Sequence, residues 1–285
     1  MEKKLLITDL DDTLYDWTGF FVPAFYAMVD EIVALTGLNR ARLLHEYRET
    51  HQRLGTVEYP YATLKLPSIR RHFAQLDDAA RKEALRPAFL RFNAIRDGSL
   101  RLFPGVEETL QTLRARGVPV IGYTESSQEN GFYRLERLGV SGYFQHVYTY
   151  HSRFQSGYAP SDKVMTVQTR KPDTAVLLRI CERERYAPGE VAYVGDSLVK
   201  DVYMGKMAGA TAVWANYPRE SNDYHEKLAA ITSWTEEDMA REERLSRHLS
   251  EGAVRPDHVI HSFPEIPPIA VSYTHLRAHE TGRNL

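Results

Sequence analysis

The sequence predicts an α/β fold, with a doubly wound parallel sheet and an α-helical domain inserted after the first strand. Two observations support this prediction. Short apolar runs alternate with amphipathic helical patterns along most of the chain, which is typical of a parallel sheet with helices on both faces. One long interval near the N-terminus interrupts the alternation with helical patterns only, which indicates a separate inserted unit.

Length and composition exclude several classes of protein. The 285 residues are 43% hydrophobic with a formal net charge of −2, which suits a folded domain and gives no attractive field for nucleic acid or an anionic membrane. The N-terminus shows no signal-peptide pattern, and no apolar run approaches the roughly 20 residues of a spanning helix. The single cysteine, Cys181, excludes an internal disulfide. We therefore expect a cytoplasmic monomer or homodimer with no nucleic-acid or membrane partner.

The expected strands are short apolar runs that end in polar residues. They cover residues 5–8, 119–123, 191–194, 211–214 and 258–260. Helical patterns follow at residues 105–116, 130–138, 173–185 and 199–208, and a charge-dense helix is expected at residues 236–251. Ligands of such sheets bind at the carboxyl ends of the strands, so polar residues at those ends are the candidates for a site.

The interval from residue 17 to residue 97 contains helical patterns and no convincing strand. Two apolar faces stand out, the first made of Phe21, Phe25, Met28, Val29 and Ile32 and the second of Leu85, Phe89, Phe92 and Ile95. We therefore divide the chain into a Rossmann-like core of residues 1–16 and 99–270 and a helical cap of residues 17–98. Residues 271–285 lack apolar periodicity and resemble translated adapter sequence, so we expect a non-native or disordered tail.

Polar residues that could catalyse a reaction or bind a ligand follow several of the expected strands. Asp9, Asp11 and Asp12 crowd the end of the first strand, although acidic turns of this kind often only cap helices or end strands. Later strand ends and loops carry Thr124, Lys171, Asp196 and Asp201, each of which alone has an ordinary structural explanation. Independent capping would not easily place all of them at strand ends. Carboxylates from two strands suit Mg²⁺, and a threonine and a lysine suit phosphate.

The chain carries four motifs in this order: DLDDT at residues 9–13, Thr124, Lys171, and GDSLVKD at residues 195–201. Together they resemble the four motifs of the haloacid dehalogenase superfamily. The segment LFPGVEETLQTLRARG at residues 102–117 resembles the stretch that re-enters the core after the cap in phosphoglycolate-phosphatase-like members. The resemblance covers about residues 4–215 and resumes around residues 256–268.

The resemblance implies a Mg²⁺-dependent phosphatase that hydrolyses a small phosphomonoester through an aspartyl-phosphate intermediate. It assigns Asp9 as the nucleophile and Asp11 as the acid that protonates the leaving alcohol and then deprotonates water. It also implies that Thr124 and Lys171 bind the substrate phosphate. The implied Mg²⁺ ligands are Asp9, the backbone carbonyl of Asp11, Asp196 and Asp201.

Elementary electrostatics agrees with these roles. A carboxylate that approaches a phosphate dianion meets a repulsion of about 4 kcal/mol per charge pair at about 4 Å and an effective dielectric of roughly 20, so a metal ion is required. For Asp11 to act as an acid near neutral pH, its pKa must lie well above the ordinary value of about 3.9. Burial under a closed cap would supply that rise, so we expect the cap to be a lid that excludes water.

Two departures and several alternatives stay open. Glu125 replaces a common Asn, so we expect it to cap the next helix or bind a cationic part of the substrate. Asp12 replaces a common Gly, a change that is tolerable if the backbone angles of Asp12 are ordinary. Alternative functions are a phosphomutase or dehalogenase of the same superfamily, a phospho-acceptor domain, or a binding-only protein. The residues considered for contact with the substrate are Arg53, Tyr59, Tyr61, Lys65, Arg70, Arg71 and the loop at 150–162.

Overall fold

A computed structural model of the chain describes residues 4–59, 61–151, 161–218, 223–250, 252 and 254–270. The expected tail at residues 271–285 and most of the loop at 150–162 lie outside the described residues. Within the described part, the strands form one seven-stranded sheet, and every neighbouring pair is parallel.

The sheet has the order β4-β3-β2-β1-β5-β6-β7. The strands are β1 Leu5–Thr8, β2 Val120–Ser127, β3 Phe144–Tyr150, β4 Val164–Val167, β5 Val191–Gly195, β6 Thr211–Ala215 and β7 His258–Ile260. The five predicted strands are therefore confirmed. The order of the strands reverses at β1, which lies between β2 and β5, so the carboxyl end of β1 is the topological switch point where ligands bind.

Two strands were not predicted. β3 contains exposed and half-buried residues among its buried ones. β4 is an edge strand, and all its residues are half-buried or exposed. Neither is the continuous apolar run expected of a buried parallel strand, because neither is covered by protein on both faces along its whole length.

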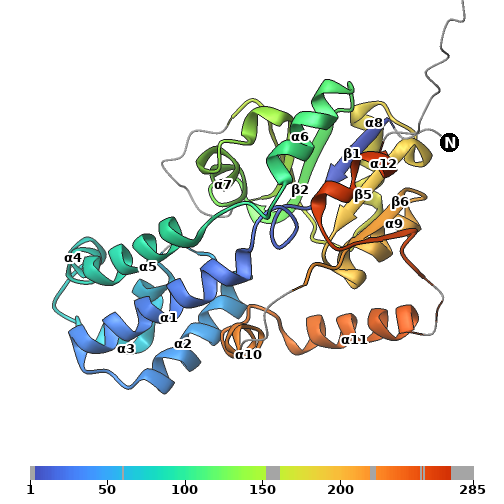
Figure 1. Ribbon diagram of the computed structural model, residues 1–285. Coiled ribbons are helices and arrows are strands. Elements are labelled where there is room, and N and C mark those ends of the chain that lie inside the picture. The colour runs from blue at the N-terminus through green and yellow to red at the C-terminus, as the bar shows by residue number, and fades with distance from the viewer. Residues whose placement is uncertain are drawn as a thin grey trace, which may run out of the picture.

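Helices cover both faces of the sheet, as the predicted fold class requires (Figure 1). One face packs on α6 Val106–Ala115, α7 Gly131–Arg137 and α12 Pro267–Ala270, and the other on α8 Thr174–Glu184 and α9 Tyr203–Met207. Successive residues of β1 serve opposite faces, since Leu6 belongs to the first hydrophobic cluster while Leu5 and Ile7 belong to the second. A π-helical turn, Leu198–Val202, precedes α9.

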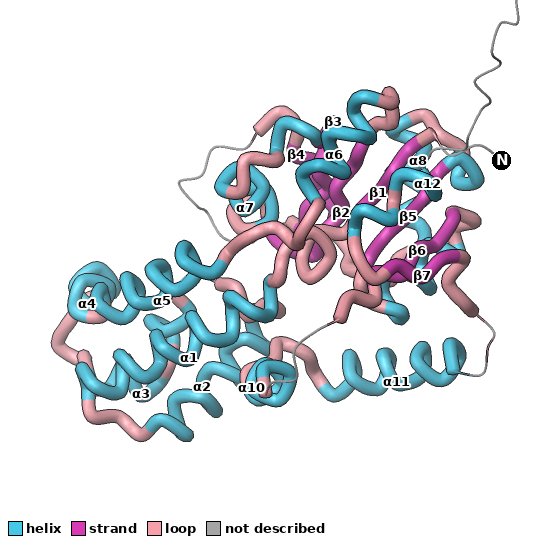
Figure 2. Tube along the Cα trace, viewed as in Figure 1, coloured by secondary structure: helices cyan, strands magenta, loops and turns pink. Residues whose placement is uncertain are grey.

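The described residues of the inserted region form helices and turns, as the sequence predicts, and the assignment of this region as a cap domain stays a prediction. Its helices are α1 Trp17–Thr36, α2 Arg40–Leu54, α3 Pro67–His72, α4 Asp78–Ala84 and α5 Arg86–Ser99, with a 3-10 turn at Ala62–Lys65. The Asp16 side chain accepts a hydrogen bond from Gly19 N at the start of α1, and Gly37 ends that helix with a φ of 68°. Figure 2 shows these helices as a layer set apart from the sheet.

The length and apolarity of α1 correct one expectation. Among the described residues it alone is, by length and composition, long and apolar enough to cross a membrane. Ten of its 20 residues are buried, and the helix packs on α5, α2 and α10 Tyr224–Ala230. Its apolar side chains thus form the centre of the cap, where Phe21 meets Phe92 edge to face at 6.1 Å.

A second insertion, between β6 and β7, joins the cap to the core. It contains α10 and the predicted charge-dense helix, α11 Glu236–Ser250. Tyr26 in α1 donates a 2.8 Å hydrogen bond to the carbonyl of Lys227, and Gln52 in α2 donates one of 3.0 Å to the carbonyl of Trp234. Figure 1 shows α10 beside α2, so residues far apart in the sequence close the cap from its other side.

Candidate active site

Asp9 follows β1 directly and enters a buried cluster of charged side chains. Its Oδ1 atom accepts a 2.6 Å hydrogen bond from Nζ of Lys171, which also donates a 2.8 Å hydrogen bond to Oδ1 of Asp201. All three side chains are buried. Tyr193 on β5 donates a further hydrogen bond of 2.9 Å to Asp201. The parallel sheet thus brings together charged residues that follow β1, β4 and β5.

This cluster contains more negative than positive charge. Burial raises the pKa of Asp9 well above its ordinary value; Lys171 opposes the rise, and the carboxylates of Asp201, Asp196 and Asp11 add to it. Burial also disfavours the charge on Lys171, but Asp201 and Asp9 outweigh burial and hold the pKa of Lys171 above its ordinary value. One ammonium group therefore faces several carboxylates, which favours the binding of a further cation.

Three of these carboxylates are placed to hold a metal ion. Oxygen atoms of Asp9, Asp196 and Asp201 lie within 4.8 Å of one another, and hard oxygen ligands suit Mg²⁺. Gly195 allows this packing, because a Cβ atom at that position would lie 2.3 Å from Cγ of Asp201. The donor set and its excess negative charge fit the ion. The role of each residue as a ligand stays a prediction, as does that of the Asp11 backbone carbonyl.

The Asp11 side chain belongs to a second cluster. Its Oδ1 atom accepts hydrogen bonds from the Tyr15 hydroxyl at 2.8 Å and from Nη1 of Arg134 at 2.6 Å. Its Oδ2 atom accepts one from Thr124 Oγ1 at 3.0 Å and lies 2.8 Å from Oγ of Ser126. Four donors, from the loop after β1, from β2 and from α7, fix the orientation of one carboxylate.

The expected rise in the pKa of Asp11 is wrong for this arrangement. Burial does raise it, but the Arg134 guanidinium and the hydroxyl groups of Ser126, Tyr15 and Thr124 outweigh burial and hold the pKa below its ordinary value. The sequence-based expectation rested on burial alone, because nothing in the residue order places Arg134 against Asp11. The surroundings of Asp11 therefore favour its charged form.

A residue of the cap, Glu58, reaches this second cluster. It accepts a 2.5 Å hydrogen bond from Nη2 of Arg134 and one of 2.8 Å from Nε1 of Trp17, and it lies 2.9 Å from Oγ of Ser126. The Arg134 side chain is only 3% exposed. One buried guanidinium thus pairs with Asp11 of the core and with Glu58 of the cap, and this pairing holds the two parts together.

β2 continues further than predicted. Thr124 lies inside this strand, is fully buried and donates to Asp11. Ser126, two residues further, points the same way because strand side chains alternate, and it lines the same cavity as Asp9 and Lys171. The prediction that Thr124 binds phosphate stays a prediction, and Ser126 is a neighbour of Asp11 that the sequence analysis missed.

The two departures from the family pattern have structural explanations. Asp12 has a φ of 57°, so the condition of ordinary backbone angles is not met, but Asp is one of the few residues that adopts this left-handed conformation. Its carboxylate accepts hydrogen bonds from N and Oγ1 of Thr18 at 3.1 and 2.6 Å. Glu125 forms an ion pair with Lys200, a partner that was not expected from the sequence, and its contact with a cationic part of the substrate stays a prediction. Burial raises the pKa of Glu125, but Lys200 outweighs burial and lowers it.

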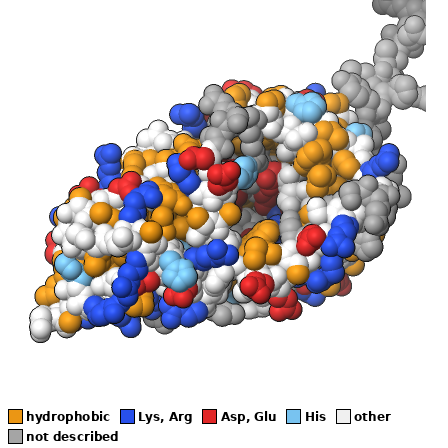
Figure 3. Space-filling view, turned by 90° about the horizontal axis from the view of Figure 1, so that it is seen from below, with side chains coloured by type: hydrophobic (Ala, Val, Ile, Leu, Met, Phe, Trp, Pro, Cys, Tyr) orange, Lys and Arg blue, Asp and Glu red, His pale blue; other side chains and the backbone are white. Residues whose placement is uncertain are grey.

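A cavity of about 450 Å³ surrounds the first cluster. It is lined by the charged residues Asp9, Lys171, Asp196 and Asp201, by Val57 and Glu58 of the cap, and by residues of the second insertion. The second insertion contributes His225, Leu228, Ala229, Thr232, Ser233 and Trp234. In Figure 3 acidic side chains are visible within a hollow of the face seen from below. Of the six cap residues proposed from the sequence, none lines this cavity.

The missed residues left only weak signals in the sequence. Arg134 is a charged residue at a buried position of α7, beside Phe132 and Leu135, and a charge on an apolar helix face marks a residue with a buried partner. Glu58 lies in a loop between helices, where no periodicity applies. Its role depends on the way in which the cap folds back over Asp11.

Comparison with known proteins gives a consistent picture. A family model described as haloacid dehalogenase-like hydrolase matches residues 3–209. Phosphoglycolate phosphatase of Pseudomonas putida is 27% identical over 214 residues, which is 75% of this chain and 70% of that enzyme. Phosphoglycolate phosphatase of Escherichia coli is 31% identical over 134 residues, so this chain spans 47% of the length of that relative.

Solved structures share the same architecture. A 2-haloacid dehalogenase from Pseudomonas syringae has a TM-score of 0.57 at 21% identity, with 94% of this chain and 97% of that chain covered. A predicted phosphoglycolate phosphatase from Haemophilus somnus has a TM-score of 0.52 at 17% identity, with 94% and 98% covered. At these identities the similarity shows a common α/β fold.

Proposed function

Because the chain belongs to the haloacid dehalogenase-like hydrolases, we propose that it is a Mg²⁺-dependent phosphatase. Its substrate is a small phosphomonoester, hydrolysed through an aspartyl-phosphate intermediate in the cytoplasm. The observation that carries this proposal is the buried Asp9, paired with Lys171 and grouped with Asp196 and Asp201 at the end of β1. Phosphoglycolate phosphatases among the relatives support phosphoryl chemistry.

Asp9 is the nucleophile of the proposed reaction. Lys171 holds Oδ1, and Oγ1 of Thr13 lies 3.3 Å from Oδ2, so the carboxylate is oriented from both sides. A carboxylate oxygen forms a bond to phosphorus, and the bond from phosphorus to the alcohol oxygen breaks. When bound by Asp9, Asp196 and Asp201, Mg²⁺ supplies charge that reduces the repulsion between carboxylate and phosphate.

Asp11 moves the proton in both half-reactions. It donates a proton to the leaving alcohol oxygen, and it then removes a proton from the water that attacks the aspartyl phosphate, which releases inorganic phosphate and restores Asp9. The charged form that Arg134 favours is the base needed for the second half. The negative charge of a bound phosphomonoester raises the pKa of Asp11 and so favours the acid needed for the first half.

The cap keeps water away from the reacting atoms. Glu58 and Val57 form the cap side of the cavity, and the ion pair of Glu58 with Arg134 holds them in place. Opening the cap for substrate entry separates Glu58 from Arg134, and closing it restores the pair. The cap is therefore a lid in this proposal, as the sequence analysis expects.

The decisive experiment measures phosphate release from a panel of phosphomonoesters with Mg²⁺ and with EDTA. We expect turnover with Mg²⁺, loss of turnover with EDTA, and a decrease of at least about 10³-fold for Asp9→Asn. The matched control is Asp30→Asn, the same change at an exposed cap residue. Wild-type turnover in Asp9→Asn would contradict the mechanism, and retention of phosphate in an isomeric product would favour the mutase alternative.

A further inference from the structure

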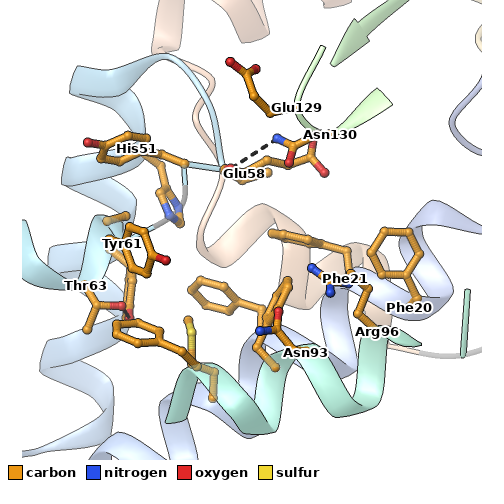
Figure 4. A pocket seen from close by; sticks show the side chains of 18 of the residues that line it. Phe20, Phe21, His51, Glu58, Tyr61, Thr63, Asn93, Arg96, Glu129 and Asn130 are labelled. Carbon is orange, nitrogen blue, oxygen red and sulfur yellow. Dashed lines mark hydrogen bonds between the residues drawn. The ribbon is translucent and has the colours of Figure 1, made fainter. Parts of the chain in front are cut away.

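The cap contains a second cavity, of about 340 Å³ (Figure 4). Its walls are mostly aromatic and include Phe21, Phe25, Tyr47, Phe89 and Phe92. A volume of a few hundred cubic ångströms with apolar walls and a few polar groups is typical of a site for a small organic ligand. The substrate-contact candidates Tyr59 and Tyr61 line this second cavity, whereas the four candidate Lys and Arg residues do not.

The cap cavity and the active-site cavity meet at the proposed acid. Val57 and Glu58 line both of them. Arg134 lines the cap cavity, and its guanidinium lies 2.6 Å from Oδ1 of Asp11, which lines the active-site cavity. Figure 4 shows Glu58 and Asn130 together at one end of the cap cavity, with Asn93 on the opposite side. The alcohol portion of a substrate whose ester oxygen faces Asp11 is therefore next to the cap cavity.

One polar group in the cap cavity points to a specific ligand feature. His51 is fully buried, and its Nε2 atom has no hydrogen-bond partner among the described residues. Its Nδ1 atom lies 2.7 Å from the carbonyl oxygen of Ile231, so Nδ1 carries the ring proton and Nε2 is an acceptor. A buried acceptor of this kind is costly unless a donor reaches it.

We propose that the cap cavity binds the alcohol portion of the substrate, and that this portion is a flat aromatic ring system with an N–H or O–H donor for Nε2 of His51. This inference rests on the proposed function and adds the substrate class to it. Aromatic walls stack well on flat rings. Phosphoglycolate, by contrast, has a short charged alcohol portion that would leave the cavity unfilled and the acceptor unpaired.

The test compares esters that all release a primary alcohol, so that leaving-group chemistry is matched. They are indolylethyl phosphate, with a ring N–H, naphthylethyl phosphate, with a ring and no N–H, butyl phosphate, and phosphoglycolate. We expect kcat/KM for the two ring esters to exceed that for butyl phosphate and phosphoglycolate by roughly tenfold or more. We also expect His51→Leu to lower kcat/KM roughly fivefold more for the indolyl ester than for the naphthyl ester, which has no N–H donor.

A second variant fills the cavity. Ala62 is buried in its wall, so Ala62→Leu should lower kcat/KM roughly tenfold for both ring esters and much less for butyl phosphate, whose short chain needs less of the cavity. The control is Ala79→Leu, the same substitution at an exposed position of α4. Circular dichroism and a thermal scan of each variant show whether it folds.

The outcomes separate the inference from the function on which it rests. Release of phosphate from all four esters without preference would overturn the inference. Equal effects of Ala62→Leu and His51→Leu on all four esters would also overturn it. In both cases the proposed phosphatase function is retained. If no ester releases phosphate with Mg²⁺ present, the proposed function fails and the inference fails with it.

Discussion

Arg134 joins the proposed chemistry to the cap. Its guanidinium lies 2.6 Å from Asp11 and 2.5 Å from Glu58 and is nearly excluded from solvent. Two carboxylates share this one buried cation, so the guanidinium offsets a repulsion that would otherwise oppose closure of the cap. Because Arg134 acts on the reaction through Asp11, we regard it as a positioning residue.

Replacement of Arg134 should therefore affect both stability and turnover. We expect Arg134→Met to lower the free energy of unfolding by roughly 3 kcal/mol, because it leaves two carboxylates without their counter-ion, and to lower kcat by about 10²-fold with a smaller effect on KM. Urea unfolding and steady-state kinetics measure the two effects. The double variant Arg134→Met/Glu58→Gln should lose less stability than the sum of the single changes.

The matched control lies on the same helix. Arg137 is half exposed and pairs with Asp97 at 3.4 Å, so Arg137→Met should cost at most about 1 kcal/mol and leave kcat unchanged. Equal stability of the Arg134 and Arg137 variants would contradict the role assigned to the Arg134 pairs.

Gly195 gives a prediction about the first cluster. A Cβ atom there would meet Cγ of Asp201 at 2.3 Å, so Gly195→Ala should displace the carboxylate that pairs with Lys171. We expect a loss of at least about 10²-fold in kcat/KM, measured as phosphate release. Gly142→Ala is the control, since nothing lies within 4 Å of a Cβ atom at that position. Wild-type phosphate release by Gly195→Ala would show that the reaction does not depend on this position of the Asp201 carboxylate.

At the scale of elements, α2 depends on a neutral histidine. Burial lowers the pKa of His51 to about 4, which outweighs the raising effect of its hydrogen bond to the carbonyl of Ile231. The rings of Phe25 and Tyr47 pack around the imidazole, with their centroids 5.7 and 5.5 Å from the centroid of the His51 ring. This contact joins α1, α2 and the end of α10, so the charge state of one side chain bears on the packing of three helices.

The pH dependence of stability follows from the direction of this shift. The pKa of His51 is lower in the folded protein than the ordinary value of 6.5, so the unfolded chain binds the proton more tightly. The stabilisation is complete above about pH 6.5 and is lost as the pH falls toward about 4, by about 3 kcal/mol in all. Urea unfolding across that range should therefore show a steeper fall for the wild type than for His51→Leu.

An exposed histidine of the same helix provides the comparison. His45 is largely exposed and lies 3.4 Å from Glu49, so His45→Leu should leave the pH dependence of unfolding close to that of the wild type. A parallel response of His51→Leu and the wild type between pH 6.5 and 4 would contradict the assignment of the acid-sensitive step to α2.

At the scale of the whole molecule, metal binding should stabilise the fold. The ligands we propose follow β1 and β5, so an ion that binds only the folded chain raises the free energy of unfolding, by about 2.7 kcal/mol at a concentration near 100 Kd. We expect Mg²⁺ to raise Tm in a thermal scan and EDTA to reverse the rise. Asp196→Asn should reduce the Mg²⁺-dependent rise in Tm, whereas the surface variant Asp30→Asn should not. An equal rise in Tm in both variants would indicate that the ion binds at a different site.

The residue order was sufficient to predict five of the seven strands, the helical character of the inserted region and the meeting of charged residues at the strand ends. A parallel strand that is buried on both faces has a continuous apolar run, and a helix with one buried face, such as α1, has an amphipathic pattern. Both patterns can be identified in the sequence alone. Asp9, Asp196 and Asp201 could be predicted to meet because the carboxyl ends of neighbouring parallel strands share one edge. β3 and β4 were not predicted, because their exposed and half-buried positions carry polar residues that interrupt the apolar run.

The contacts of Asp11 depended on folding in three dimensions. Arg134 comes from a helix of the core and Glu58 from a loop of the cap, 76 residues apart in the sequence, and no local pattern couples such positions. Their pairing reversed the direction expected for the pKa of Asp11, since a nearby guanidinium outweighs burial. The aromatic cavity has the same origin: apolar periodicity showed that these rings were buried, and the packing of α1 against α2 and α5 left a space among them.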